Sequence, residues 1–82
     1  MIRAYIDTAM KHAHYELIDQ PGDPYCGEIP GLDGVMACGS SLEECRANLE
    51  DALDAWVALG LQLGHEIPPI DGVALGRLRV SA

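Results

Sequence analysis

The first twelve residues carry apolar side chains at intervals of three and one. This spacing is typical of one face of an α-helix and predicts a short helix over residues 2–12. A helix of this length is marginal on its own, so we expect it to pack against the rest of the protein. The apolar residues of this face are Ile2, Tyr5, Ile6, Ala9 and Met10.

Three short strands are predicted to follow this helix. They cover residues 13–19, 25–29 and 35–38, and the first alternates in polarity from residue to residue. Residues 20–24 (Gln-Pro-Gly-Asp-Pro) and 31–34 (Gly-Leu-Asp-Gly) are rich in turn-forming residues. Because short turns join consecutive strands, the strands are expected to form an antiparallel meander.

Three glycines lie in or next to these turns. We expect Gly31, Gly34 and Gly39 to adopt positive φ angles, which glycine accepts without steric cost. The phosphate-binding patterns G-x-x-x-x-G-K-[ST] and G-x-G-x-x-G are absent from the sequence, so the glycines indicate turns and not a nucleotide site.

A long helix is predicted to start at residue 42. Ser41 and Glu44 form a capping box, in which the hydroxyl accepts from the N–H of Glu44 and the carboxylate reaches back. The helix extends for about six turns, with Gly64 as its C-terminal cap and Pro68-Pro69 beyond it. Its apolar stripe consists of Leu42, Cys45, Leu49, Ala52, Leu53, Trp56, Leu59, Gly60 and Leu63.

The second half of this helix has no charged residue from Ala55 to Leu61. A helix that is apolar all round is buried on all sides, and so short a chain has few residues to cover it. We therefore predict a homo-oligomer, a homodimer or homotetramer. Its interface would contain Trp56, Val57, Leu59 and Leu61.

The predicted elements form one α+β domain over residues 1–82. Their order is α-β-β-β-α, with the long helix packed on a three-stranded antiparallel sheet. Residues 70–80 alternate in polarity and permit a short final strand, on which Arg77 and Arg79 would share one face.

Composition and charge narrow the classes of partner. The 82 residues carry 5 Lys and Arg against 13 Asp and Glu, a net charge of −8. Binding to a phosphate backbone requires clustered basic residues, so no direct nucleic-acid binding is expected and a charged partner should be basic. No run of about 18 apolar residues is present, so no membrane span is expected.

The cysteines and histidines indicate structural roles. Cys26, Cys38 and Cys45 are odd in number and form no C-x-x-C motif, which argues against a disulfide scaffold and for a reducing, cytoplasmic location. With the histidines, they lack the spacing of a metal site or of a nucleophile-base pair. We therefore expect no metal, no cofactor and no enzymatic activity. The three histidines are His12, His14 and His65.

Two blocks of sequence resemble the HicB antitoxin family. The first is Ile-Pro-Gly-Leu-Asp-Gly at residues 29–34. The second contains Ser-Leu-Glu-Glu-Cys at 41–45, Asn-Leu at 48–49 and Asp-Ala-Leu at 51–53. Both blocks lie between residues 29 and 53, with the separation that the family shows.

The resemblance implies a partial ribonuclease H-like fold without nuclease activity. It also implies a function, the neutralisation of a small basic HicA-like toxin that cleaves mRNA. Many HicB antitoxins carry a C-terminal DNA-binding domain. This chain ends at Ala82, so we do not expect it to bind an operator directly.

Partner contacts are expected on the sheet and its turns. The candidates, chosen by position and exposure, are Tyr25, Glu28, Asp33 and Met36. For Tyr25 and Met36, a role in the core or in an oligomer is an equal alternative. The alternative is an orphan homo-oligomer with a structural or regulatory role, no toxin partner and no catalytic activity.

Overall fold

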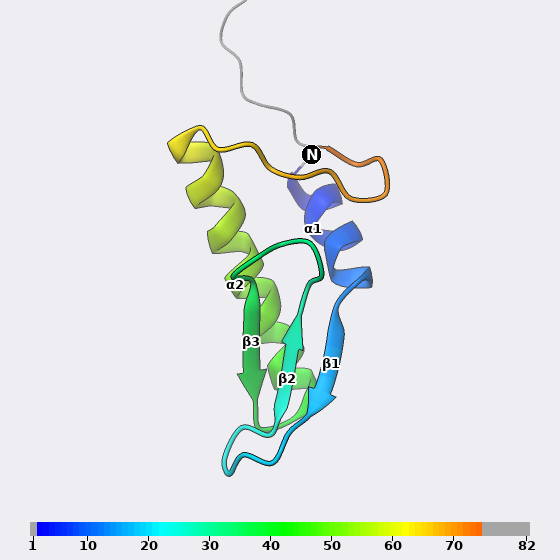
Figure 1. The fold of residues 1–82 in the computed structure, drawn as a ribbon, viewed down its shortest axis with the longest axis vertical. Coiled ribbons are helices and arrows are strands. Elements are labelled where there is room, and N and C mark those ends of the chain that lie inside the picture. The colour runs from blue at the N-terminus through cyan, green and yellow to red at the C-terminus, as the bar shows by residue number, and fades with distance from the viewer. Residues whose placement is uncertain (1, 75–82) are drawn as a thin grey trace, which may run out of the picture.

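The computed structural model describes residues 2–74 and contains two helices and three strands (Figure 1). Their order confirms the predicted α-β-β-β-α arrangement, and each boundary lies within two residues of the predicted one. The elements are α1 (Ile2–Lys11), β1 (His14–Leu17), β2 (Tyr25–Glu28), β3 (Met36–Gly39) and α2 (Leu42–Leu63).

The strands form an antiparallel meander in the order β1-β2-β3. Cys26, in the central strand, lies opposite Glu16 of β1 and Cys38 of β3. In the β2–β3 turn, Gly31 and Gly34 have φ angles of 91° and 90°, as predicted. The prediction for the third glycine, Gly39, was wrong, because its φ is not positive and its role is close packing against α2.

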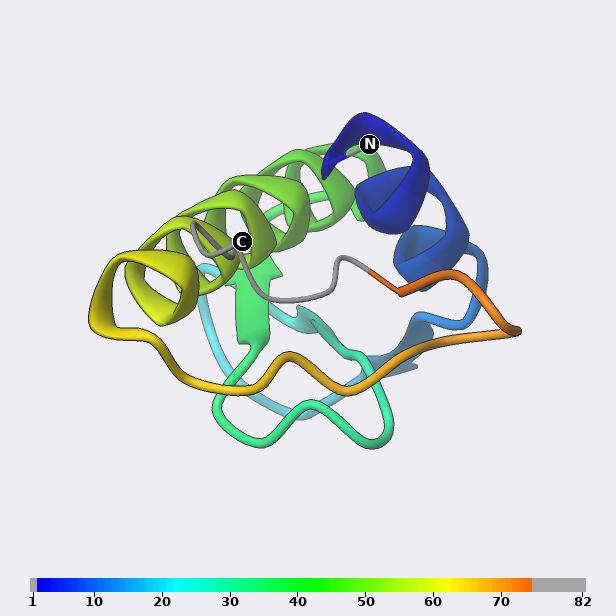
Figure 2. The same ribbon diagram turned by 90° about the horizontal axis from the view of Figure 1, so that it is seen from above.

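Both helices lie on one face of the sheet, so the fold has two layers (Figure 2). The core between the layers draws on α1, α2, the β2–β3 turn and the segment that follows α2. Side chains of the sheet, including Tyr15 and Ala37, pack against it from below. The buried core consists of Tyr5, Ile6, Ala9, Met10, Ile29, Leu32, Val35, Leu49, Leu53, Val57 and Ile67.

Both predicted caps of α2 are present. The Ser41 Oγ accepts a hydrogen bond from the Glu44 N–H at 3.1 Å. The Glu44 carboxylate reaches one residue further back than a standard capping box, and accepts from the N–H of Ser40 at 2.6 Å. At the other end Gly64 adopts a φ of 76°, and the His65 N–H donates to the Gly60 carbonyl at 2.8 Å.

The chain after α2 turns back toward α1 and crosses the end of the molecule at which α2 finishes (Figures 1 and 2). Ile67 is buried there, and its Cδ1 lies 2.7 Å from where a Cβ on Gly60 would be. The Tyr5 hydroxyl donates to the Pro68 carbonyl at 2.5 Å, and His12 Nε2 lies 2.7 Å from Asp71 Oδ2. These contacts fix the segment to both helices.

One prediction for the charge-free half of α2, the interface role of Val57, was wrong. Val57 was expected at an interface between copies, but it is 1% exposed in the protein's own core. The sequence pattern had not revealed that residues 65–74 fold back and cover this side of the helix. Residues 70–74 form a turn closed by an isolated β-bridge between Ile70 and Val73, so the predicted final strand was wrong over this part. Residues 75–80 of that prediction lie outside the described residues.

Of the helices within residues 2–74, none combines the length and the hydropathy needed to cross a lipid bilayer.

Candidate functional site

The face of the sheet that points away from the helices is uncovered. In Figure 1 it faces the viewer, with α2 behind it. Strand register places two rows of three residues on it, Glu16–Cys26–Cys38 and His14–Glu28–Met36. We call this surface the open face. Its members are His14, Glu16, Cys26, Glu28, Met36 and Cys38.

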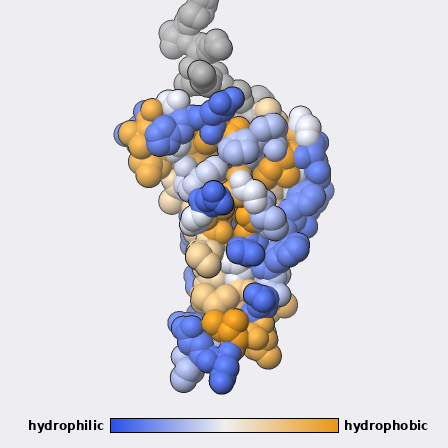
Figure 3. All heavy atoms as spheres, viewed as in Figure 1, coloured by the Kyte–Doolittle hydropathy of each residue, from blue (hydrophilic) through white to orange (hydrophobic). Residues whose placement is uncertain are grey.

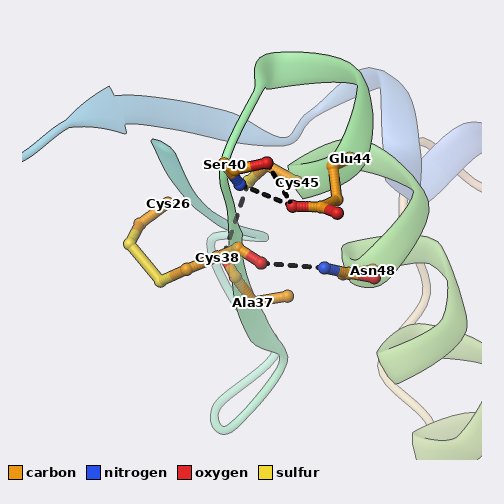
Figure 4. Close-up of a disulfide and its surroundings, with 7 residues drawn as sticks. All are labelled: Cys26, Ala37, Cys38, Ser40, Glu44, Cys45 and Asn48. Atoms are coloured by element: carbon orange, nitrogen blue, oxygen red, sulfur yellow. Dashed lines mark hydrogen bonds between the residues drawn. A yellow bond between two sulfur atoms is a disulfide. The ribbon is translucent and has the colours of Figure 1, made fainter. Parts of the chain in front are cut away.

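A disulfide bond lies in the middle of the open face. Cys26 and Cys38 are bonded across the β2–β3 pair, with their Cα atoms 4.0 Å apart (Figure 4). The sequence argument against a disulfide was therefore wrong for Cys26 and Cys38, whereas Cys45 is free and buried. The two cysteines are 12 residues apart in the sequence and form no C-x-x-C motif, so no local pattern indicates that they pair. Only the strand register brings them together. The expectation of a reducing compartment loses this support, and the cytoplasmic location stays a prediction.

Helix α2 holds β3 from the opposite side of the sheet (Figure 4). Asn48 Nδ2 donates a hydrogen bond to the Cys38 carbonyl at 2.9 Å. The thiol of Cys45 donates to the Ala37 carbonyl at 3.5 Å, and burial raises the pKa of that thiol, which favours the protonated donor. These bonds and the disulfide fix the position of the strand that borders the open face.

The open face contains a shallow depression of about 350 Å³. Its lining includes His14, Glu16, Cys26, Glu28 and Met36. Met36 is 61% exposed and supplies an apolar side chain at the surface of this depression. Seen from this side, hydrophilic and apolar residues are interspersed over the molecule (Figure 3). The depression therefore combines the carboxylates of Glu16 and Glu28 with the flexible apolar side chain of Met36.

Charge is distributed unevenly between the two layers. Residues 14–39, which form the sheet and its turns, contain five acidic residues and no Lys or Arg. All five are exposed: Glu16, Asp19, Asp23, Glu28 and Asp33. The sheet layer is therefore a region of negative potential.

The basic residues within the described part of the chain lie on the helices. They are Arg3, Lys11 and Arg46. Arg3 forms salt bridges with Asp7 at 2.8 Å and with Glu50 at 3.0 Å. Hydrogen bonds to these two carboxylates raise the pKa of Arg3. It neutralises acids of the helix layer, and within residues 2–74 no ion pair involves an acid of the sheet layer.

The structure brings together two of the four predicted partner-binding residues. Glu28 and Met36 lie opposite each other on the open face, and both are exposed. Asp33 is exposed in the β2–β3 turn. Tyr25 alternates with the open-face residues of β2, so it belongs to the other side of the sheet, where it is half-buried. Glu16 was not predicted, because only strand pairing shows that it shares a face with Glu28.

The predicted oligomer residues divide in a similar way. Leu59 is 55% exposed, whereas Trp56 and Leu61 are half-buried. Trp56 and Leu59 line a second depression of about 290 Å³ together with residues 65–67. A surface for a second copy would therefore centre on Leu59, and Val57 has no part in it.

The three histidines lie in different parts of the fold. Within residues 2–74, no three His, Cys, Asp or Glu side chains are arranged as metal ligands. His12 contacts Asp71, His14 lies on the open face, and His65 contributes its backbone to the cap of α2.

Comparisons with known proteins place the chain in a family. A family model described as UPF0150-like matches residues 4–68, which include the open face, α2 and all but the first two residues of α1. The chain belongs to the UPF0150-like family. Among solved structures, this UPF0150-like protein is similar to TTHA0281 from Thermus thermophilus. The identity is 44%, the TM-score is 0.90, and 95% of each chain is covered. No curated protein matches the sequence.

Proposed function

We propose that this UPF0150-like protein is a HicB-like antitoxin, which binds and neutralises a small basic HicA-like mRNA ribonuclease. It acts by covering its partner and not by catalysis. The observation that carries the proposal is the uncovered, acidic sheet layer, which has five exposed carboxylates and no Lys or Arg between residues 14 and 39.

The two sequence blocks that resemble HicB antitoxins support this proposal through their positions. Residues 29–34 form the turn that joins β2 to β3, and Ser41 caps the helix that fixes β3 from behind. Both blocks therefore build the scaffold that presents the open face. A negative surface attracts a basic partner over a distance, so association should be fast at low salt and slower at high salt.

The proposal is tested with a purified HicA-like toxin and a defined mRNA. The toxin is first shown to cleave the mRNA alone. One equivalent of this protein should then stop cleavage, and the two should co-elute as a complex that 0.5 M NaCl weakens.

An unrelated globular protein of similar size and charge serves as the matched control and should leave cleavage unchanged. The proposal fails if cleavage continues at a tenfold excess of this protein, or if the control inhibits equally.

A further inference from the structure

We infer that the open face is a docking surface for a segment of a basic protein, with one arginine of that segment seated between Glu16 and Glu28. This inference rests on the proposed function for the choice of a basic protein partner. It goes beyond it by assigning the surface, the anchoring residue and its two carboxylate partners.

The geometry of the sheet places the two carboxylates at a suitable spacing. Glu16 pairs with Cys26, and Glu28 is two residues further along the same strand as Cys26. Such diagonal neighbours lie roughly 7–8 Å apart on one face of an antiparallel pair. A planar guanidinium placed between them can donate hydrogen bonds to both carboxylates at once.

The depression also has a place for the apolar part of the anchor. Met36 lies directly opposite Glu28 and is 61% exposed. An arginine bends its aliphatic stem along apolar surface while its charged head remains among polar groups. The flexible Met36 side chain can adapt to that stem, and Cys26, held by its disulfide to Cys38, also lines the depression.

Charge favours a basic segment over the other occupants. No Lys or Arg is present between residues 14 and 39 to pair with these acids, so two copies joined by their open faces would bring carboxylates against carboxylates. A nucleic acid would be repelled in the same way. An arginine-bearing segment instead supplies the cation that the face lacks.

The test uses a capped hexapeptide of sequence Ala-Arg-Ala-Ala-Arg-Ala as the probe, followed by the backbone amide resonances of the isotopically labelled protein. The largest saturable shift changes are expected at open-face residues, and a peptide with Gln in place of Arg should produce none. Shifts centred on the helices, no saturable shifts, or a doubled molecular mass that blocks the peptide would overturn the inference.

Two double variants separate the site from the overall charge. E16K/E28K and D51K/D54K each change the net charge from −8 to −8 + 4 = −4. The first pair lies on the open face, and the second is exposed on α2. Peptide affinity should fall at least tenfold in E16K/E28K and less than twofold in D51K/D54K. Equal losses in both would overturn the inference.

Circular dichroism checks that both variants fold. If E16K/E28K unfolds, the isosteric pair E16Q/E28Q is compared with D51N/D54N in the same way. The HicA-like toxin is then titrated with the same variants. A toxin that binds E16K/E28K as well as the parent overturns this surface and leaves the proposed function intact. A peptide on the open face, with no inhibition of the toxin, supports the surface and refutes the proposed function.

Discussion

A Cβ atom on Gly39 would lie 2.6 Å from the backbone nitrogen of Cys45. Real Cβ atoms do not approach backbone this closely, and neither β3 nor the start of α2 can yield as a side chain could. The absence of a side chain at Gly39 therefore allows α2 to pack directly on the strand that borders the open face.

Gly39→Ala should accordingly lower the free energy of unfolding by about 3 kcal/mol, in the range of overpacking in a closed core. Gly64→Ala is the matched control, because nothing lies within 4 Å of its Cβ position and only its φ of 76° is strained. It should cost about 1 kcal/mol. Urea unfolding of both variants decides the matter. Similar losses would contradict the packing role of Gly39.

The disulfide gives a second prediction. Reduction of Cys26–Cys38 should lower the free energy of unfolding by about 3 kcal/mol, because the bond closes a loop with a sequence separation of 12 in the unfolded chain. The fold should persist at low denaturant, since the core lies on the other side of the sheet. Dithiothreitol should shift the urea midpoint of the parent and leave that of C26S/C38S unchanged. A shift of the midpoint in both proteins would show that dithiothreitol acts on something other than this disulfide.

The sequence predicted the elements well because their signals are local. Helical spacing, turn residues and the Ser41–Glu44 cap each act within a few positions. The open face is different, because strand register decides which residues share it. The Cys26–Cys38 pair and the Glu16–Glu28 pair therefore had no local signal. Val57 continues the four-residue spacing of Cys45, Leu49 and Leu53, so its burial had a local signal in α2. The return of Ile67 to the same core had none.

The different surroundings of Val57 and Leu59 lead to a third prediction. Val57→Ala should reduce the free energy of unfolding by about 2 kcal/mol, because it opens a cavity in the core. Leu59→Ser should cost less than about 0.5 kcal/mol, as is usual for an exposed position. Thermal unfolding measures both.

Oligomeric state separates the same two residues. If a second copy covers the exposed half of α2, Leu59→Ser should lower the mass measured by light scattering, and Val57→Ala should leave it unchanged. A mass unaffected by Leu59→Ser would remove this helix face from any interface between copies.

The hydroxyl of Tyr5 gives a fourth prediction. Tyr5→Phe keeps the buried ring but removes the hydrogen bond to the Pro68 carbonyl, and should cost about 1 kcal/mol at pH 7. Burial raises the pKa of Tyr5 above its ordinary value of 10.0. The pKa of Tyr5 is therefore higher in the folded protein than in the unfolded chain. Its contribution to stability is complete below pH 10.0 and is lost as the pH rises through the folded-state pKa. The gap between parent and variant should therefore narrow above pH 10.0, as followed by urea unfolding. A gap that widens would contradict the assignment.

The carboxylate of Glu44 gives the last prediction, with the opposite sign. Hydrogen bonds from the N–H of Ser40 and from its hydroxyl, at 2.6 and 2.8 Å, lower the pKa of Glu44 below 4.5. The pKa of Glu44 is therefore lower in the folded protein than in the unfolded chain. Its contribution to stability is complete above the unfolded-state pKa and is lost as the pH falls through the folded-state pKa. Glu44→Gln should thus be less stable than the parent at pH 7, and the difference should shrink below pH 4.5. Glu43→Gln removes a charge from the same helical turn without removing a bond to Ser40, so its effect should be smaller. Urea midpoints of the three proteins from pH 7 to pH 3 test this directly. A constant difference between parent and Glu44→Gln would mean that the bonds to Ser40 do not depend on the charge of the carboxylate.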